Sequence, residues 1–367
     1  MNADLLVDLD QYRANLAALR TYAPSALQMA VVKANAYGHG MVPMARAARQ
    51  GGADWLGVAT PAEALELRAA GDRGPLLCWL AVPGAPFAEL IDADVEVTAS
   101  GVDQLQAIAA AGDRPRVQLK VDTGLSRNGA FGPQWDDLVA AAARLQEAGS
   151  IEVTGIWSHF ASADEPENPS NDHQESVFRA AVDQLAAAGV DPGLRHLANS
   201  AAAVTRPSSH FDLVRMGIAA YGIDPDPAVH VPEVRPVLTA RTVLANVKRV
   251  PAGASVSYGW RWTADRETTL GLVPVGYGEG IHRTASNRAE VGFDGNRVPV
   301  RGTICMDQLV VDLGDQPARI GDPVTVFGPG DDGEPTAQDW ADAAGTIAYE
   351  IVTRLAGRWS RTYRGER

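Results

Sequence analysis

Cysteine is scarce in this chain, which has only Cys78 and Cys305 among its 367 residues. The two cysteines are far apart and form no Cys-x-x-Cys pair, which argues against a disulfide framework and a thiolate metal site. Long hydrophobic runs are also missing. The most apolar segment, PLLCWLAVPGAPFAELI, is interrupted by proline and glycine and is too short to span a bilayer. We therefore expect no bound metal and no membrane segment.

Positive charge is the other deficit. The chain has 32 Lys and Arg residues against 45 Asp and Glu residues, a formal net charge of -13. Because an acidic surface repels phosphate backbones and anionic lipids, nucleic acid and membranes are poor candidate partners. The opening segment MNADLLVDLD has no basic region followed by an apolar stretch. No signal peptide is expected, and the cytoplasm is the expected location.

From about residue 28, short apolar runs alternate with alanine-rich helical segments, and glycines 71, 112, 149 and 189 follow those segments as helix stops. The expected strands are Leu27–Lys33, Trp55–Ala59, Leu76–Leu80, Val95–Thr98, Val117–Asp122, Val153–His159, Arg195–Asn199 and Leu213–Ile218. About eight such alternations predict an α/β fold, a (β/α)8 TIM-like barrel over residues 10–230. An open, doubly wound sheet is the alternative.

The pattern changes near residue 225, where DPDPAVHVPEVRP has the composition of a linker. Strand-like runs then replace the helical pattern, with one helical patch at Ala337–Ala344. These runs are Leu238–Val250, Leu270–Val275, Val298–Gly302, Leu309–Leu313 and Val324–Phe327. They predict a mainly β C-terminal domain over residues 231–367. Residues 1–9, with a strand at Leu5–Leu9, are expected to pair with it.

Lys33 ends the apolar run QMAVVK, which is an expected barrel strand. A residue at the carboxyl end of a barrel strand points into the mouth, where active sites are built. A partly desolvated lysine there has a lowered pKa and can form a Schiff base with an aldehyde. The alternative is a strand-end lysine whose amine extends into solvent.

The segment AVVKANAYGHG resembles the cofactor-attachment segment of the alanine racemase family, whose cofactor is pyridoxal 5′-phosphate (PLP). The resemblance implies that Lys33 holds the cofactor and that Tyr37 bonds its phosphate. In LKVDTGLSRNG it implies that Arg127 orients the cofactor and the substrate carboxylate. Lys120 matches a lysine that is carbamylated in many members. Residues next to the arginine differ from those of many relatives: Leu125, Ser126 and Asn128.

Three further segments at expected strand ends resemble the family: GIWSHFASAD, HLANSAA and DLVRMGIAAYG. The implied contacts are His159 beside the cofactor ring, Asn199 near the cofactor, Ser200 on the phosphate, Arg215 at the pyridine nitrogen, and the backbone N–H groups of Gly217 and Ile218 on the phosphate. An arginine cannot accept a proton from the ring. The resemblance therefore implies a weaker electron sink and fewer side reactions than an acidic partner would give.

The C-terminal segments SVSYGWRWTA, VGYGEG, GTICMDQ and AGTIAYEIVTR also resemble the family. They imply that Tyr258 is the second catalytic base and that Met306 lines the substrate pocket, with its backbone N–H on the carboxylate. Tyr349 would narrow the entrance and contact the phosphate. Without the resemblance, Tyr258 and Tyr349 would be half-buried aromatic residues of a β domain.

Taken together, the resemblance implies racemisation of L-alanine to D-alanine, for peptidoglycan, with Lys33 and Tyr258 as the two bases. It also implies a head-to-tail homodimer in which Tyr258 comes from the other subunit and contacts His159, which in turn contacts Arg215. Three alternatives stay open. They are a broad-specificity amino-acid racemase, a barrel-type PLP amino-acid decarboxylase, which has an acidic residue at the ring nitrogen, and a non-catalytic PLP-binding protein, which is essentially the barrel alone.

Overall fold

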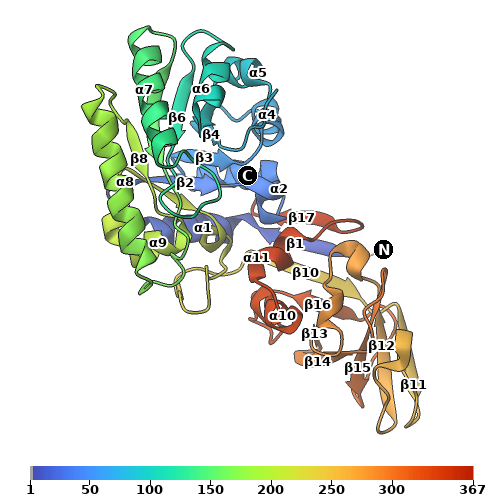
Figure 1. Ribbon diagram of the computed structural model, residues 1–367. Helices are drawn as coiled ribbons and strands as arrows, with labels where there is room; N and C mark the ends of the chain where they lie inside the picture. The colour runs from blue at the N-terminus through green and yellow to red at the C-terminus, as the bar shows by residue number, and fades with distance from the viewer. Residues whose placement is uncertain (1–2, 367) are drawn as a thin grey trace. The chain divides into compact units, whose positions relative to one another are not determined.

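The computed structural model describes residues 3–366, and contacts divide the chain into two compact units, drawn in Figure 1. We call them the barrel unit and the β unit. The barrel unit comprises Tyr12–Ala36 and Met41–Val234. The β unit comprises the residues up to Gln11, the short segment Tyr37–Gly40 and the residues from Arg235 onward.

The barrel unit is built on an eight-stranded sheet within the described residues, in the order β8-β7-β6-β5-β4-β3-β2-β9. Its strands are β2 (Leu27–Val31), β3 (Trp55–Val58), β4 (Leu76–Cys78), β5 (Glu96–Ala99), β6 (Arg116–Lys120), β7 (Glu152–Trp157), β8 (Leu194–His196) and β9 (Leu213–Met216). Every pairing is parallel. The end strands also meet, because Asp212 N donates to Arg195 O and Arg215 N to Ala198 O, each at 3.1 Å. The sheet therefore closes into the expected TIM-like barrel, and the open-sheet alternative is wrong.

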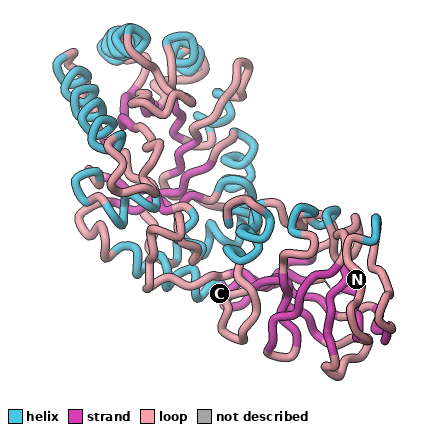
Figure 2. The backbone as a smooth tube through the Cα atoms, turned by 60° about the horizontal axis from the view of Figure 1, so that its bottom comes forward, coloured by secondary structure: helices cyan, strands magenta, loops and turns pink. Residues whose placement is uncertain are grey.

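Helices surround these strands, as Figure 2 shows for the barrel unit. They are α1 (Leu9–Arg20), α3 (Met41–Gln50), α4 (Pro61–Ala69), α5 (Phe87–Asp92), α6 (Val102–Ala109), α7 (Pro133–Glu147), α8 (Ser170–Ala187) and α9 (Ser200–Thr205), with the 3-10 turns η1 (Pro207–Ser209) and η2 (Ile218–Tyr221). Strands covered on both faces need continuous apolar sequence, and the residues of β3 and β9 are all buried. Met29, Trp55, Leu77 and Leu213 form one cluster of this core.

The β unit holds a nine-stranded sheet among the described residues, in the order β11-β12-β15-β14-β13-β16-β10-β1-β17. Its strands are β1 (Asp4–Asp8), β10 (Leu238–Val243), β11 (Asn246–Val250), β12 (Thr268–Val273), β13 (Glu290–Phe293), β14 (Asn296–Arg301), β15 (Leu309–Gly314), β16 (Pro323–Phe327) and β17 (Ser360–Arg364). The helices are α10 (Ala337–Ala344) and α11 (Ala348–Thr353), with the 3-10 turns η3 (Tyr258–Trp260), η4 (Tyr277–Glu279) and η5 (Arg283–Ala285). The opening strand β1 pairs antiparallel with β10 and parallel with β17.

Two expectations about strands are wrong. The run Leu238–Val250 is not one strand, because the chain changes partners between β10 and β11. Leu244 N bonds to Asp322 O and Ala245 N to Leu272 O, at 2.9 and 2.8 Å. The other error concerns Lys33, which does not belong to a strand. β2 ends at Val31, and Lys33 begins the short turn α2 (Lys33–Tyr37).

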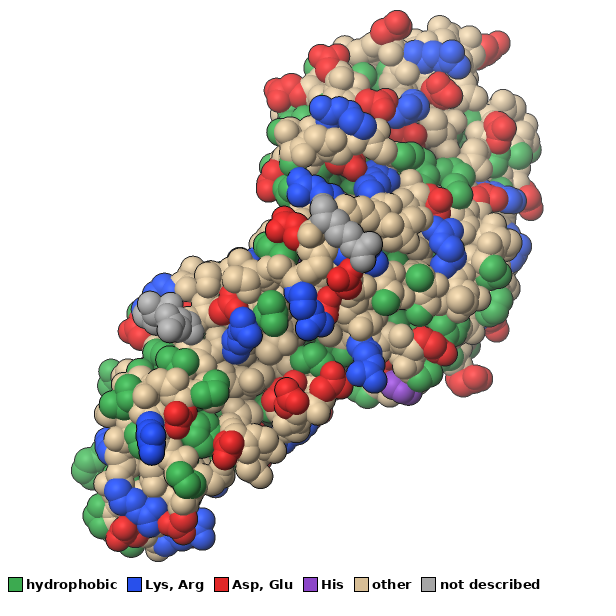
Figure 3. Space-filling model, turned by 180° about the vertical axis from the view of Figure 1, so that it is seen from behind, with side chains coloured by type: hydrophobic (Ala, Val, Ile, Leu, Met, Phe, Trp, Pro, Cys, Tyr) green, Lys and Arg blue, Asp and Glu red, His purple; other side chains and the backbone are tan. Residues whose placement is uncertain are grey.

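The surface and the helices agree with the composition. In the face drawn in Figure 3, acidic and basic side chains are interspersed and no broad basic patch is visible. Within residues 3–366, no helix combines the length and the apolar character that crossing a membrane requires. The same residues contain no cluster of three or more His, Cys, Asp or Glu side chains suited to a metal ion.

Candidate active site

Lys33 lies just beyond the carboxyl end of β2, the end at which barrel enzymes build their sites. Its Nζ lies 5.8 Å from the centre of the Trp79 ring. Within residues 3–366, this amine makes no hydrogen bond or ion pair. Burial lowers the pKa of Lys33, nearby Arg127 lowers it further, and Glu63 opposes the shift. A lowered pKa increases the fraction of neutral, nucleophilic amine.

The backbone after Lys33 forms a left-handed turn. Ala34, Asn35 and Ala36 have φ angles of 53°, 54° and 52°. For L-residues this conformation costs roughly 1–2 kcal/mol each, so neighbouring groups must hold it. Glu63 is one of them: its carboxylate accepts the Ala34 N–H at 2.7 Å, and Asn35 Oδ1 accepts the N–H of Met41 at 2.9 Å. The turn therefore fixes where the Lys33 side chain starts.

Arg215, on β9, is only 4% exposed and is surrounded by hydrogen-bond acceptors. Its Nη1 donates to Nδ1 and to the backbone oxygen of His196, both at 3.1 Å. Its Nη2 donates to the backbone oxygens of Ser158 and Leu197 and to Nδ1 of His159, at 2.8, 3.0 and 3.1 Å. The Nε–H alone makes no hydrogen bond within the described part of the chain. Arg215 therefore keeps one donor for a ligand.

The two histidines beside Arg215 are neutral acceptors. Burial, with Arg215 as the largest charge nearby, holds the pKa of both His159 and His196 well below its usual value. Burial also lowers the pKa of Arg215 to about 9, so the guanidinium stays charged near neutral pH. The structure thus brings Arg215 and His159 together, as the resemblance implied.

Lys120 ends β6 with its Nζ 4.1 Å from the centre of the Trp157 ring. Burial, followed by the charges of Arg215 and Arg127, lowers the pKa of Lys120 to about 7. Arg127 itself is exposed. Its loop is held by Asp122, whose Oδ1 accepts the N–H groups of Gly124 and Ser126 at 2.9 and 3.1 Å. The barrel mouth therefore concentrates positive charge, which suits an anionic ligand.

Asn199, Ser200, Gly217 and Ile218 are the expected ligands of the cofactor at the ends of β8 and β9. Asn199 Oδ1 accepts the N–H of Ala202 at 3.0 Å and caps helix α9. Ser200 Oγ accepts the N–H of Gly217 at 2.8 Å. Ser200 and Gly217 therefore meet, but here they bond to each other. A phosphate that uses both groups would replace this bond.

In the β unit, Tyr258 stands on the turn η3 and is 74% exposed. The turn is held from both sides. Ser257 Oγ donates to Thr303 O at 2.6 Å, and Thr303 Oγ1 donates to Tyr258 O at 2.9 Å. Ser257 itself has a φ of 62°, a left-handed conformation that these bonds help to maintain. The backbone beneath the phenol is thus fixed while the ring remains accessible.

Met306, 54% exposed, lies beside the same turn in a pocket of about 670 Å³ whose lining includes Tyr258, Trp260 and Tyr277. The two expected family segments VGYGEG and GTICMDQ run side by side here, because Tyr277 N donates to Cys305 O at 3.0 Å and Gly278 N to Met306 O at 2.8 Å. A Cβ on Gly276 would lie 2.2 Å from Cys305 O. Only glycine at position 276 allows the backbone to come this close to Cys305 O.

Tyr37 and Tyr349 also come together within the β unit, with ring centres 6.3 Å apart. Tyr37 is 7% exposed, and burial raises the pKa of its phenol. The segment containing Tyr37 is tied to this unit by Gly38, whose backbone oxygen accepts from Arg361 Nε at 2.9 Å. A Cβ on Gly38 would lie 2.1 Å from Val352 O. The structure thus brings Tyr37 and Tyr349 together, and their contact with a phosphate stays a prediction.

Several residues of the barrel site were not found from sequence: Glu63, Trp79, Trp157 and His196. Glu63 had a usable signal, because Thr60-x-x-Glu63 ahead of an apolar run is the pattern of a capping box, and α4 indeed begins with one. Trp79 and Trp157 had no such signal in the sequence. Trp157 lies under cations that only the closed barrel brings together, with the Arg215 guanidinium 5.2 Å from its ring centre.

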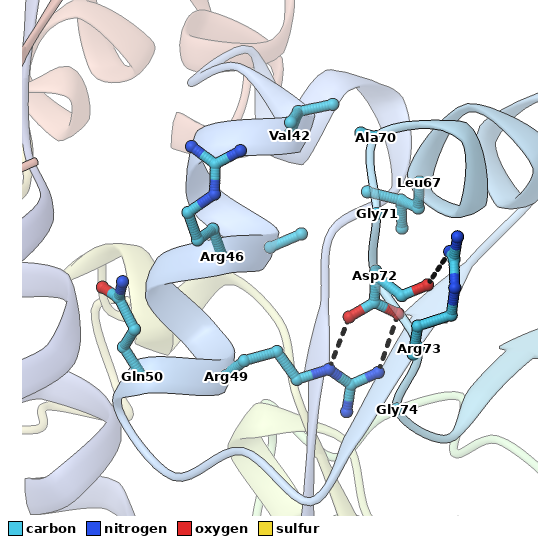
Figure 4. Close-up of a pocket in the computed structure, with 11 residues that line it drawn as sticks. Val42, Arg46, Arg49, Gln50, Leu67, Ala70, Gly71, Asp72, Arg73 and Gly74 are labelled. Carbon is cyan, nitrogen blue, oxygen red and sulfur yellow. Dashed lines mark hydrogen bonds and ion pairs between the residues drawn. The ribbon is translucent and has the colours of Figure 1, made fainter. Parts of the chain in front are cut away.

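A different pocket, of about 310 Å³, lies on the outside of the barrel between α3 and α4 (Figure 4). Arg49 is its most prominent cation, and its Nε and Nη2 donate to the two carboxylate oxygens of Asp72 at 2.8 and 3.1 Å. Arg68 pairs with the same carboxylate at 2.7 Å. Arg49 is therefore held by a carboxylate, and none of the expected site residues lines this pocket.

The closed barrel, the lysine amine at its mouth and the buried arginine beside it define a class of protein. They are the features of barrel proteins that attach an aldehyde-bearing anion through a lysine. Family models narrow the class further. The model described as alanine racemase, N-terminal domain, matches residues 7–225, and that of the C-terminal domain matches residues 237–363.

Individual relatives agree. Alanine racemase of Thermobifida fusca is 51% identical over 367 residues, 99% of this chain and 98% of the relative. The crystal structure of alanine racemase from D-cycloserine producing Streptomyces lavendulae matches with a TM-score of 0.97 at 52% identity, over 100% of this chain and 97% of that one. Alanine racemase from Bacillus anthracis with bound L-Ala-P gives 0.91 at 32% identity, over 100% and 96%. This chain belongs to the alanine racemase family.

Proposed function

We propose that this protein is a PLP-dependent alanine racemase, which interconverts L-alanine and D-alanine. The observation that carries the proposal is the Lys33 amine, which lies at the barrel mouth with a lowered pKa and with no hydrogen-bond partner among residues 3–366. Relatives with this name cover essentially the whole chain, which supports alanine as the substrate.

The barrel residues fit the proposed cofactor. PLP has an aldehyde, a ring nitrogen and a phosphate, and the site offers a group for each. The Lys33 amine suits the aldehyde, and the unused Nε–H of Arg215 suits the ring nitrogen. For the phosphate we propose the Ser200 hydroxyl and the backbone N–H of Ile218, and the family resemblance adds Tyr37, which belongs to the β unit. When bound, PLP supplies an electron-withdrawing ring that stabilises negative charge at the substrate Cα.

Racemisation requires a proton to leave one face of Cα and another to arrive on the opposite face. We assign the first face to the Lys33 amine, because its lowered pKa leaves it able to accept and return a proton. The phenol oxygen of Tyr258 takes the second face. Arg127 binds the substrate carboxylate through its guanidinium fork. The backbone N–H of Met306, which lies beside Tyr258, assists from the same copy as Tyr258.

Tyr258 reaches a barrel mouth, in this proposal, from a second copy of the chain in a head-to-tail homodimer. The exposed apolar side chains around it support a partner surface, since Trp260 is 76% and Met306 54% exposed beside Tyr258. Trp260→Asp tests this by sedimentation: the variant should dissociate and lose racemisation while still binding PLP. A variant that stays fully active as a monomer would contradict the shared site.

Lys120 is proposed as a carbamate. Its pKa of about 7 provides neutral amine near neutral pH, and that amine adds to carbon dioxide with release of one proton. The carbamate would carry a negative charge next to Arg127 and restrain its exposed side chain. Incubation with carbon-13 bicarbonate should give one carbamate signal that is absent from Lys120→Met.

The rival activities have weaker support. A barrel-type decarboxylase places an acidic group at the ring nitrogen, whereas this site places Arg215 among five acceptors. A binding protein made of the barrel alone would not need the β unit or its exposed Tyr258. A broad-specificity racemase differs only in its tolerance of side chains, and steric selection is worth roughly 1–3 kcal/mol per methylene.

The test is direct. Purified protein with PLP and L-alanine should produce D-alanine until the two enantiomers are equal, as followed by chiral chromatography. Parallel reactions with L-serine and L-leucine separate a narrow racemase, which should show minor turnover of serine, from a broad one. Unchanged L-alanine and L-serine would overturn the activity. Supply of D-alanine for peptidoglycan stays a prediction of the family resemblance, and the cytoplasm stays a prediction from the opening segment of the sequence.

A further inference from the structure

A line of buried polar side chains crosses the interior of the barrel behind Arg215. It consists of Glu96 on β5, Gln118 on β6 and His196 on β8, which are 6%, 1% and 0% exposed. Barrel interiors are normally filled by branched apolar side chains. Burying polar groups is costly unless each finds a partner, so a complete buried network at this place requires a reason.

Each member of the line is hydrogen-bonded to the next. Gln118 Nε2 donates to Glu96 Oε2 at 2.8 Å, and Thr154 Oγ1 donates to the same oxygen at 2.7 Å. Gln118 Oε1 lies 2.7 Å from Nε2 of His196. His196 Nδ1 lies 3.1 Å from Nη1 of Arg215. The chain of bonds therefore runs without interruption from the Glu96 carboxylate to the guanidinium at the proposed site.

The donors and acceptors allow one proton arrangement along this line. Arg215 can only donate, so while the 3.1 Å contact is kept His196 Nδ1 accepts and carries no hydrogen. The neutral imidazole then carries its hydrogen on Nε2 and donates to Gln118 Oε1. Gln118 in turn presents its amide hydrogens to Glu96, which accepts. A carboxylate at one end and a guanidinium at the other thus both favour the Nε2–H tautomer of His196.

Neighbouring residues make room for this arrangement. Gln118 crosses over Gly155 on β7, where a Cβ would lie 3.0 Å from Gln118 Cδ and 2.8 Å from Leu194 O. The His196 ring is parallel to that of Trp157, with an interplanar angle of 7° and ring centres 5.7 Å apart. The path of Gln118 and the plane of His196 are therefore both fixed by packing as well as by hydrogen bonds.

We propose that Gln118, backed by Glu96, is a positioning residue that holds His196 in its Nε2–H tautomer and thereby aims the unused Nε–H of Arg215 at the ring nitrogen of the cofactor. This inference rests on the proposed function only for the identity of that acceptor. Gln118 touches neither cofactor nor substrate in this scheme. It acts through His196, and then through Arg215.

The experiment uses the full chain labelled with nitrogen-15 histidine, before and after loading with PLP. Two-bond proton–nitrogen spectra report which ring nitrogen of each of the seven histidines carries hydrogen, and His196→Asn assigns the signal. Wild type should show the Nε2–H form at His196 in both states. Gln118→Met should give a mixture of tautomers, because the Nε2–H loses its 2.7 Å acceptor and only the 3.1 Å contact with Arg215 then opposes the Nδ1–H form.

Two further variants serve as comparisons for Gln118→Met, and a third can replace it. Glu96→Gln keeps an acceptor for Gln118 and should retain the wild-type tautomer. Gln28→Met is the matched control, since Gln28 is an equally buried glutamine of the barrel, at 1% exposed, whose amide bonds instead to Leu16 O. It should leave both the His196 signal and racemisation unchanged. Gln118→Asn, whose amide is too short to bridge both neighbours, replaces Gln118→Met if the latter fails to fold.

Turnover provides the second readout. In Gln118→Met, kcat should fall by up to ~100-fold with little change in KM, as expected when a catalytic group is misaligned and substrate binding is not. A wild type lacking the Nε2–H form, or a Gln118 variant unchanged in tautomer and kcat, would overturn the positioning role. A correct tautomer in a protein that does not racemise alanine would instead refute the proposed function and leave the network standing.

Discussion

The barrel and the η3 surface of the β unit, which carry the two proposed bases, differ in burial: Lys33 is half-buried beside fully buried groups, and Tyr258 is exposed. Arg215 and His196 in the barrel are 4% and 0% exposed, whereas Tyr258 and Trp260 on η3 are 74% and 76% exposed. Burial in the barrel shifts pKa values and fixes hydrogen-bond partners before any ligand arrives. The η3 surface instead fixes only the backbone beneath its side chains. The barrel half of the proposed site is therefore largely held within its own unit, while the η3 half would, in the proposed dimer, be covered by a partner.

The largest expected effect lies in the barrel. Lys33→Ala should abolish racemisation and covalent attachment of PLP, because the only amine proposed to join the aldehyde is removed. Borohydride reduction followed by peptide mapping should place the label on Lys33 in wild type and on no residue in the variant. Lys248→Met, at an exposed lysine of β11, is the control. A label on another residue in wild type would remove the basis of the mechanism.

The η3 surface should give an asymmetric effect. Tyr258→Phe keeps the ring and loses the phenol oxygen, so PLP should bind as before while one proton transfer is lost. Removal of a general base typically costs 10²–10⁴-fold in rate, as an order of magnitude. Exchange of the Cα proton with deuterium should therefore slow strongly from one enantiomer only. Equal slowing from both enantiomers would contradict the assignment of one base to each face.

A third prediction uses the buried charge of Lys120. Its pKa of about 7 lies below the ordinary lysine value, so above pH 7 the unfolded chain binds a proton that the folded chain has released. Stability should therefore rise with pH there, by at most about 1.4 kcal/mol per pH unit. Lys120→Met should remove the Lys120 part of this slope and leave the part due to Lys33, whose pKa is also lowered, as measured by urea unfolding in carbon-dioxide-free buffer. Lys248→Met, exposed on β11, should follow wild type, and an unchanged slope in Lys120→Met would place the titration elsewhere.

The barrel was more accessible from sequence than the β unit, for a physical reason. Parallel strands buried on both faces must be continuously apolar, so runs such as Trp55–Ala59 located each barrel strand within a few residues. The antiparallel strands depend on pairing partners that sequence does not show. The strand β13, Glu290–Phe293, was therefore missed, and β10 was not separated from β11.

For the candidate site, too, the sequence showed local features but not the contacts between distant residues. Motif resemblance pointed to Lys33, Arg215 and Tyr258 as candidates, but it could not reveal the groups that hold them. A left-handed turn containing two alanines contradicts local preference, and it is held by bonds that the local pattern does not show, such as the one from Ala34 N to Glu63. The line from Gln118 to His196 joins residues 78 positions apart in sequence. Such contacts arise from barrel closure, not from local pattern.

The smallest predicted effect concerns Glu63, which links the rigid barrel to the strained turn. Its carboxylate accepts the N–H groups of Ala34, Ala59 and Thr60 at 2.7, 2.8 and 3.0 Å, and its charge raises the pKa of Lys33. Glu63→Gln should lower the free energy of unfolding by about 1 kcal/mol, because an amide cannot accept with both of its polar atoms.

The same substitution should lower the pKa of Lys33 further, since an opposing negative charge is removed. The pH dependence of Lys33 acylation in the cofactor-free protein measures this shift. Glu66→Gln, exposed on the same helix, is the matched control and should alter neither quantity. If Glu63→Gln and Glu66→Gln behave alike, the turn at Lys33 is held by other groups, and the contrast between a preorganised barrel and an incomplete η3 surface loses one of its supports.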